Sequence, residues 1–346
     1  MKMKKSKVIL IISIDTECDK GPNWEVKYPL RFLSVTHGIP NLLTPLFKKY
    51  GIKPTYLLSP EVMKDKESVH VLSFLEHCEL GTHLHGEFIS PDEELGACRT
   101  DTPQLLYSPE VEREKLVNLT NLFEKRFGYR PRSFRAGRFG ISRFTLKFLE
   151  ELGYWVDSSI TPFRSHNFGN GLVSDHWGAP LEPYFPSLAD PRVPGNLSIL
   201  EVPVTIIIPQ IARCPAWALR TIGRFGRIRR LIVKRFGPPR WLRPLRGTPT
   251  ELIATAEAVI SAWKGKGPPI LNIMFHSVEV IPGANPYTKT QKDVDYLLDS
   301  LNQLFEHLYA KYKVISLTLS EIAQWAKRGW KYSQQETARV IRDELV

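Results

Sequence analysis

The sequence predicts an α/β protein built as a distorted (β/α) barrel of seven or eight units. Two observations carry this prediction: short, nearly continuous apolar segments alternate with amphipathic segments, and seven or eight such units follow one another along the chain. Apolar runs of this kind indicate parallel strands that are buried on both faces and connected by helices. An open, doubly wound sheet has the same alternation and is the rival architecture. A single barrel over residues 1–346 is the expected domain organisation.

In the first half of the chain, each expected strand is followed by a helix or a loop. Strands are expected at 8–14, 53–58, 79–85, 133–136 and 155–158. Helices are expected at 40–50, where Gly51 ends the helix, at 109–127 and at 142–153. Ser108 and Pro109 are typical first residues of a helix, and Ser142 is a second capping residue. Residues 158–196, which are rich in Pro, Gly, Asn and Ser, are expected to form a long irregular connection.

The second half continues the same alternation. Strands are expected at 199–207, 270–275 and 314–317. Thr248 and Glu251 form a capping box in front of a helix that reaches residue 263. Apolar residues recur at helical spacing between 294 and 308, and Thr318 with Glu321 caps a last helix.

The composition excludes several protein classes. Apolar residues make up 42% of the chain and charged residues 24%, which is ordinary for a globular protein. The longest apolar run, 8–14, is far shorter than the roughly 20 residues of a membrane-spanning helix. This run also lacks a small-residue cleavage site, so we interpret it as a strand and expect a cytoplasmic protein. The four cysteines are widely spaced and are expected to be reduced thiols: Cys18, Cys78, Cys98 and Cys214.

The positive charge of the protein is concentrated in one segment. The formal net charge is +11, and residues 211–247 contain eleven Arg and Lys but no Asp or Glu. Apolar positions from 222 to 232 recur near a helical period. This pattern predicts a basic amphipathic helix that lies on an anionic membrane surface. An insertion that packs its apolar side on the barrel explains the pattern equally well. Nucleic acid is a weaker alternative because no recognition motif is present.

Ionisable side chains stand at or just after the carboxyl ends of five expected strands. They are Asp15, Glu17, His83, His85, Glu87, Arg135, Arg138, Asp157 and His276. In barrel enzymes the active site lies at this end of the strands. Residues i and i+2 of an extended segment point the same way, so Asp15 and Glu17 share a direction, as do His83 and His85. Two histidines and one carboxylate are suitable ligands for zinc, and also for iron, cobalt or manganese.

Four motifs, in this order, resemble those of the polysaccharide deacetylases of the NodB-homology type. They are Asp-Thr-Glu at 15–17, Gly-Thr-His-Leu-His at 81–85, Phe-Arg-Ala-Gly at 134–137 and Met-Phe-His-Ser at 274–277. The resemblance runs from about residue 7 to 325, with 211–247 as an addition. It implies a distorted (β/α) barrel and a metal-dependent hydrolase that removes an N-acyl group, such as acetyl, from an amino sugar of a glycan or glycan precursor. A catalytically inactive or purely carbohydrate-binding relative at a membrane surface is the alternative.

The resemblance also implies a role for each residue. Asp15 would be the general base, oriented by Arg135, and His276 the general acid. Glu17 and His83 would bind a divalent ion, zinc first and cobalt, manganese, iron or nickel as alternatives. The family has a second histidine four residues after the first, where this chain has Glu87. The remaining ligand is therefore His85 or Glu87, while Arg138 and Asp157 would support the site or the substrate, Asp157 by orienting His276 or by binding substrate.

Overall fold

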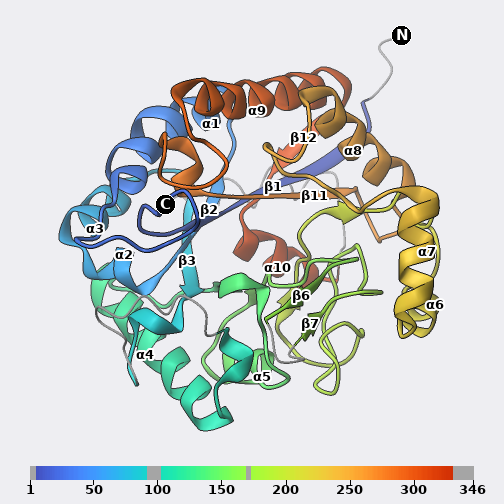
Figure 1. Ribbon diagram of the computed structural model, residues 1–346, viewed down its shortest axis with the longest axis horizontal. Coiled ribbons are helices and arrows are strands. Elements are labelled where there is room, and N and C mark those ends of the chain that lie inside the picture. The colour runs from blue at the N-terminus through green and yellow to red at the C-terminus, as the bar shows by residue number, and fades with distance from the viewer. Residues whose placement is uncertain (1–4, 92–102, 169–172, 330–346) are drawn as a thin grey trace.

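The computed structural model describes residues 5–91, 103–168 and 173–329, which form a curled parallel sheet surrounded by helices (Figure 1). Eight strands make up the sheet: β1 (Lys7–Thr16), β2 (Pro54–Leu58), β3 (Glu79–Leu84), β4 (Ser133–Ala136), β5 (Val156–Asp157), β8 (Leu200–Glu201), β11 (Ile270–His276) and β12 (Lys313–Ser316). Their order is β11-β1-β2-β3-β4-β5-β8, and β12 pairs with the first half of β1. The order follows the chain from β1 to β8, so right-handed crossovers place the connecting helices on one side of the sheet. The distorted barrel is confirmed, and the doubly wound alternative is wrong.

The helices form an outer layer around these strands (Figure 1). They are α1 (Thr44–Tyr50), α2 (Pro60–Lys64), α3 (Lys66–Ser73), α4 (Pro109–Phe127), α5 (Thr145–Glu151), α8 (Pro249–Ala262) and α9 (Gln291–Lys311). A π-helix, η1 (Ser34–Leu43), continues into α1, so the helix expected at 40–50 begins six residues earlier. Ser108 and Thr248 cap their helices as expected, whereas α5 begins at Thr145 rather than at Ser142. Within the described residues, no helix is both long enough and apolar enough to cross a membrane.

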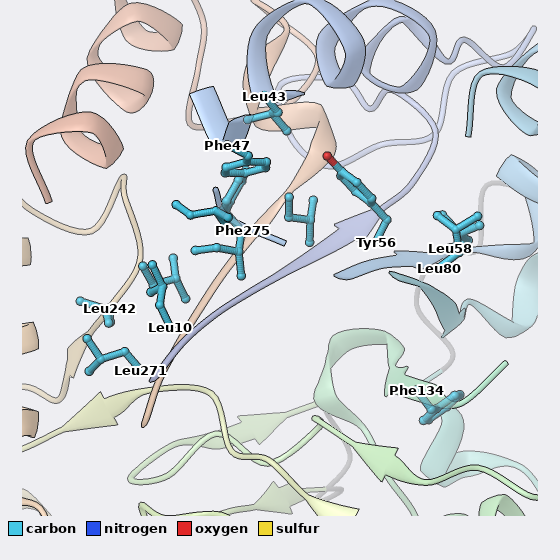
Figure 2. Close-up of a cluster of buried hydrophobic side chains, with 14 of the residues drawn as sticks. Leu10, Leu43, Phe47, Tyr56, Leu58, Leu80, Phe134, Leu242, Leu271 and Phe275 are labelled. Carbon is cyan, nitrogen blue, oxygen red and sulfur yellow. The ribbon is translucent and has the colours of Figure 1, made fainter. Parts of the chain in front are cut away.

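The strands of the barrel alternate between two apolar layers. Even-numbered residues of β1, such as Leu10 and Ile14, pack outward against the helices. Figure 2 shows this outer layer, with Phe47 of α1 near Phe275 of β11. Odd-numbered residues point into the barrel, where Ile9 and Ile11 are apolar while Ser13, Asp15 and Glu17 are polar or charged. The interior therefore changes from apolar to polar toward the carboxyl ends of the strands, where the ionisable residues lie.

Helix α10 (Leu319–Lys327) closes the apolar end of the barrel. Four of its side chains pack in the cluster that contains Ile9 and Ile11: Leu319, Ile322, Ala323 and Ala326. The helix lies in the middle of the ring of helices in Figure 1, and Thr318 with Glu321 forms the expected capping box. A reaction site inside the barrel is therefore expected at the other end, where the carboxyl ends of the strands and the ionisable residues lie.

Replacing Ile322 by alanine is expected to lower the free energy of unfolding by about 2–5 kcal/mol, because Ile322 is fully buried inside the barrel. Chemical denaturation measures the change, and Gln324→Ala on the less buried side of α10 is the matched control. An equal loss of stability in both variants would contradict the conclusion that α10 closes the barrel through its buried side chains.

The segment expected as one strand at 199–207 is divided into β8 and β9 (Ile206–Ile207). Pro203 lies between them and has no N–H to contribute to a strand ladder. Asn272 of β11 bridges this part of the barrel instead, because its Nδ2 donates to the carbonyl oxygens of Val202 at 3.2 Å and Pro203 at 3.3 Å. The barrel is therefore closed here by side-chain hydrogen bonds together with one backbone bond, from Thr205 N–H to the carbonyl oxygen of Asn272 at 3.1 Å.

The basic segment forms two helices rather than one. Helix α6 (Ala216–Gly223) and helix α7 (Gly226–Phe236) are separated at Arg224 and Phe225, and lie at the right-hand edge of Figure 1. A Cβ on Gly223 would lie 2.1 Å from Cδ1 of Trp177, so this contact needs glycine. The continuous helix expected over 222–232 is wrong. The irregular connection at 158–196 also contains a small hairpin, β6 (Ser165–Asn167) with β7 (Val173–Asp175).

Candidate metal centre and active site

The carboxyl ends of four strands bring the predicted residues together. Asp15 on β1 lies opposite His276 on β11, and His83 on β3 lies opposite Arg135 on β4. Glu17 follows β1 directly. Asp15, Glu17, His83 and Arg135 are buried, whereas the side chain of His276 is 15% exposed. His276 is therefore the member of this group that faces solvent.

Three side chains form a cluster that can hold a metal ion. Glu17, His83 and His85 each offer one ligand atom, and these atoms all lie within 4.8 Å of one another. Glu17 Oε1 is 3.2 Å from His83 Nε2 and 3.3 Å from His85 Nε2. Tetrahedral zinc with bonds of about 2.0–2.1 Å separates its ligand atoms by roughly 3.3–3.4 Å. The donor types and the two distances from Glu17 Oε1 therefore fit a divalent ion of this kind, which would have one position left for water or substrate.

Hydrogen bonds orient both histidines for this role. His83 Nδ1 donates to the carbonyl oxygen of Arg135 at 2.9 Å, because that oxygen can only accept, and Nε2 is the nitrogen that faces Glu17 and could bind a metal. His85 Nδ1 lies 3.0 Å from Glu87 Oε1. Such partners commonly fix the tautomer of a metal-binding histidine.

The structure separates the two candidates for the second-motif ligand. His85 presents Nε2 to Glu17, whereas Glu87 lies against the other nitrogen of the same ring. Arg138 Nη2 donates to Glu87 Oε1 at 2.9 Å and thereby fixes the carboxylate. His85 is thus the candidate whose nitrogen joins the Glu17–His83 cluster, and Glu87 with Arg138 lies behind it.

Lys20 is a component of the centre that sequence reasoning missed. Its Nζ lies 3.1 Å from Glu17 Oε2, and both side chains are almost fully buried. Burial disfavours the ammonium, yet the charge of Glu17 holds the pKa of Lys20 above its ordinary value. The lysine occupies one carboxylate oxygen and leaves Oε1 facing the histidines. Lys20 follows Glu17 by three residues, but its loop is fixed by a bond from Lys20 N to the distant Ala284 carbonyl.

Asp15 and Arg135 form a buried ion pair at the same edge of the barrel. Arg135 Nη1 donates to Asp15 Oδ1 at 2.6 Å, while Nε and Nη2 bind oxygens of Ser158 and Ser13. Burial alone would raise the pKa of the Asp15 carboxyl, but Arg135, with His83 and His276, holds it below its ordinary value. Asp15 Oδ2 points toward His83 and His276, at 3.9 and 3.8 Å from their Nε2 atoms. An ionised carboxylate with one available oxygen can accept a proton.

His276 directs its ring toward the carboxylates of Asp15 and Glu17. Its Nε2 lies 3.8 Å from both Asp15 Oδ2 and Glu17 Oε1. Its Nδ1 lies 3.0 Å from Glu279 Oε1, and Arg243 forms an ion pair with that carboxylate. Glu279 therefore orients the ring. Sequence reasoning missed both Glu279 and Arg243.

Asp157 does not have the role expected for it. Its carboxylate is fully buried and accepts from Ser159 Oγ at 2.6 Å, so it can neither orient His276 nor bind substrate. Burial raises the pKa of Asp157 and, more strongly, that of its neighbour Glu201, with which it shares a hydrogen bond. Ser159 in turn accepts from the backbone N–H of Ala136. Asp157 thus stabilises the strand ends that hold Arg135.

The remaining histidines contribute no ligand to this centre in the described part of the chain. Burial lowers the pKa of His166 to about 4 and that of His176 to about 3, and both rings contact Thr161 Oγ1. They are neutral packing residues. His37 is exposed and contacts Thr36. Cys98, predicted to be a reduced thiol, lies outside the described residues, whereas Cys18, Cys78 and Cys214 are free thiols.

Comparison with known proteins identifies the fold. No family model and no curated protein matches the sequence. Among solved structures, a Mycobacterium smegmatis protein described as a polysaccharide deacetylase is 15% identical, with 96% of this chain and 94% of that chain covered and a TM-score of 0.53. A Parabacteroides distasonis protein described as a glycoside hydrolase/deacetylase is 15% identical, with coverage of 96% and 74% and a TM-score of 0.60.

The same fold also occurs in a protein with a different printed activity. A GH57-type branching enzyme from the archaeon Pyrococcus horikoshii is 12% identical, with 96% of this chain and 71% of that chain covered and a TM-score of 0.50. At these identities the likeness shows a shared fold. The fold expected from the deacetylase resemblance is confirmed, and the activity has to be argued from the site.

Proposed function

We propose that this protein, which has the fold of the polysaccharide deacetylase structures, is a metal-dependent hydrolase that removes an N-acyl group from an amino sugar. The observation that carries the proposal is the placement of Asp15 and His276 on neighbouring strands beside the Glu17–His83–His85 cluster. A proton acceptor and a proton donor thus face one candidate metal position, which is what amide hydrolysis requires.

The residues of the site have separate tasks in this reaction. A divalent ion held by Glu17, His83 and His85 would polarise the acyl carbonyl and make water a stronger nucleophile at neutral pH. Asp15 Oδ2 takes the proton of the attacking water, and Arg135 keeps the carboxylate ionised. His276 Nε2 gives a proton to the departing amine, and Glu279 holds the ring in place through Nδ1.

The experiment is metal analysis of the purified protein combined with an assay of acyl release. We expect about one divalent ion per chain and release of acetate or formate from at least one member of a panel of N-acylated amino sugars. A stoichiometric metal with no release from any N-acyl sugar would favour the catalytically inactive, binding relative. Release that persists after chelation would contradict the metal-dependent mechanism.

Glycoside cleavage, the class of chemistry suggested by two of the fold neighbours, fits the site less well. A glycosidase needs two carboxyl groups that are available to the scissile bond. Here Glu17 Oε1 contacts two histidines and Oε2 binds Lys20, so Asp15 is the carboxylate of the pair with an available oxygen. Amide hydrolysis needs only that one carboxylate, together with His276.

Metal binding is expected to strengthen with rising pH. Burial alone would lower the pKa of His85, but the carboxylates of Glu17 and Glu87 raise it to about 9 in the metal-free protein. His85 is therefore protonated at neutral pH and must release a proton to become a ligand. The affinity should rise by up to about tenfold per pH unit below pH 9 and level off above it. Competition with a chromophoric chelator between pH 6 and 9 measures this, and a flat profile would exclude His85 as a ligand.

We also propose that the basic segment 211–247 attaches the protein to an anionic membrane surface. Trp217, Phe225 and Leu231 are 66%, 60% and 63% exposed. Helical spacing places Leu231 beside Arg227, Lys234 and Arg235, which are also exposed. The other side of the pair packs on the protein body, where Leu219 lies in one buried cluster with Phe163 and Trp177. The segment therefore combines both expected arrangements, a packed side and an exposed basic, apolar side.

Co-sedimentation with vesicles tests this attachment. We expect binding to vesicles that contain anionic lipid, weaker binding at high salt, and loss of binding in a Trp217→Ser/Phe225→Ser/Leu231→Ser variant. Tyr296→Ser, which alters an exposed aromatic on α9, is the matched control. Salt-insensitive binding, or no binding, would leave only the packing role, and binding to nucleic acid alone would replace the membrane as the partner. The cytoplasmic location stays a prediction.

A further inference from the structure

A surface of aromatic rings and arginines extends outward from His276. The Trp24 ring lies 4.9 Å from the His276 ring and 5.6 Å from the ring of Tyr287. Arg243 and Arg246 lie over Tyr287, with Cζ at 5.0 and 5.5 Å from its centroid. The residue that faces solvent at the candidate active site is therefore bordered by cations.

Three arginines lie around the ring of Trp241. The Cζ atoms of Arg164, Arg243 and Arg246 lie 5.7, 5.5 and 6.0 Å from its centroid. Interaction of each guanidinium with the ring is worth only about 0.5–2 kcal/mol, which does not neutralise the charge. The three like charges come from two segments: Arg243 and Arg246 lie in the loop after β10 (Arg240–Trp241), and Arg164 directly precedes β6.

Two of these three arginines have no acidic partner. Arg243 is paired with Glu279, but no carboxylate among the described residues forms an ion pair with Arg164 or Arg246. The hydrogen bond that Arg246 makes from its side chain is to the hydroxyl of Tyr287, at 3.4 Å. Arg164 Nε is buried without a hydrogen-bond partner. Burial, together with the charge of Arg246, lowers the pKa of Arg164, so the pair is electrostatically unfavourable as it stands.

We propose that Arg164 and Arg246 bind an anionic group of the substrate, a phosphate or a carboxylate attached to the acylated amino sugar. The buried Nε of Arg164 has no hydrogen-bond partner, which costs free energy. An oxyanion that accepts from Arg164 and from the exposed Arg246 would recover this cost and relieve the repulsion between the two charges. The planar fork of arginine suits oxygens of this kind. This inference rests on the proposed hydrolase function and narrows its substrate from any acylated sugar to an anionic conjugate.

Direct binding of anions tests the subsite independently of turnover. Calorimetric titration with inorganic phosphate and with glucuronate is expected to show binding to the native protein. In an Arg164→Gln/Arg246→Gln variant the binding of the preferred anion should weaken by about 10- to 100-fold. Arg240→Gln removes an exposed arginine next to Trp241 and is the matched control, because alternate residues of a strand point to opposite sides. The preferred anion distinguishes a phosphorylated substrate from a uronic acid.

Kinetics with matched substrates complete the test. The native protein should have a higher kcat/KM for an N-acyl amino sugar phosphate or uronate than for its neutral methyl glycoside. The double variant should lose that preference through KM rather than kcat, and Arg164→Lys should retain part of it. No anion binding, or no change of preference in the variant, would overturn the subsite. Anion binding without acyl release from any sugar would instead overturn the hydrolase function and leave the subsite in place.

Discussion

Replacing Asp15 by asparagine is expected to lower kcat by about 100- to 10,000-fold while the protein still binds its metal ion. Asparagine keeps the size of the side chain and an oxygen that can accept from Arg135, but it cannot take a proton from water. Metal binding should persist because the cluster is formed by Glu17, His83 and His85. Steady-state kinetics and metal analysis on the same preparation measure both effects.

This prediction needs a control for stability. Arg135 is fully buried, and removing the charge of its partner can destabilise the fold by about 3–5 kcal/mol. Asp19→Asn alters a nearby buried carboxylate that accepts from the backbone N–H groups of Leu33 and Ser34 and does not face the centre. Thermal unfolding of both variants separates loss of folding from loss of chemistry. A folded, metal-loaded Asp15→Asn protein that retains full activity would exclude Asp15 as the base.

The residues of the site that sequence reasoning identified are those tied to strand ends. Parallel strands begin and end at common edges, so Asp15, His83, Arg135 and His276 had to converge once the strands were recognised. The spacing of His83 and His85 predicted a shared direction, because both residues lie on extended backbone. These inferences needed only periodicity and strand polarity, which are local properties of the sequence.

The residues that were missed depend on contacts between distant segments. Lys20 lies beside Glu17 in a loop that Ala284 and Arg31 hold through backbone hydrogen bonds. Arg243 reaches Glu279 across 36 positions of the chain. Asp157 was misplaced for the same reason, since its partner Glu201 on β8 could not be recognised from the strand end alone.

The errors in the predicted secondary structure have equally specific causes. Pro203 divides an apolar run that otherwise favours one strand. Two glycines of the basic segment, Gly223 and Gly226, divide a run that otherwise favours one helix. In both places the apolar pattern was read correctly, while the residue that interrupts the hydrogen bonding was given too little weight.

Replacing His83 by alanine is expected to abolish stoichiometric metal binding, and acyl release with it. The variant leaves Glu17 and His85, and two ligands hold a divalent ion far less tightly than three. The Nε2 of His83 lies 3.2 Å from Glu17 Oε1, so its loss removes one corner of the cluster. Elemental analysis after dialysis should fall from about one ion per chain to nearly none.

Glu87→Gln is the matched comparison because it distinguishes a ligand from its support. Glu87 contacts His85 Nδ1 at 3.0 Å and does not face Glu17. Its replacement should weaken metal affinity by only about 10- to 100-fold, the usual effect of altering the partner of a metal-binding histidine. His85→Ala, by contrast, should lose the ion as completely as His83→Ala does. Complete loss in Glu87→Gln with retention in His85→Ala would reverse the assignment of the third ligand, because a carboxylate that only orients a histidine cannot matter more than the histidine itself.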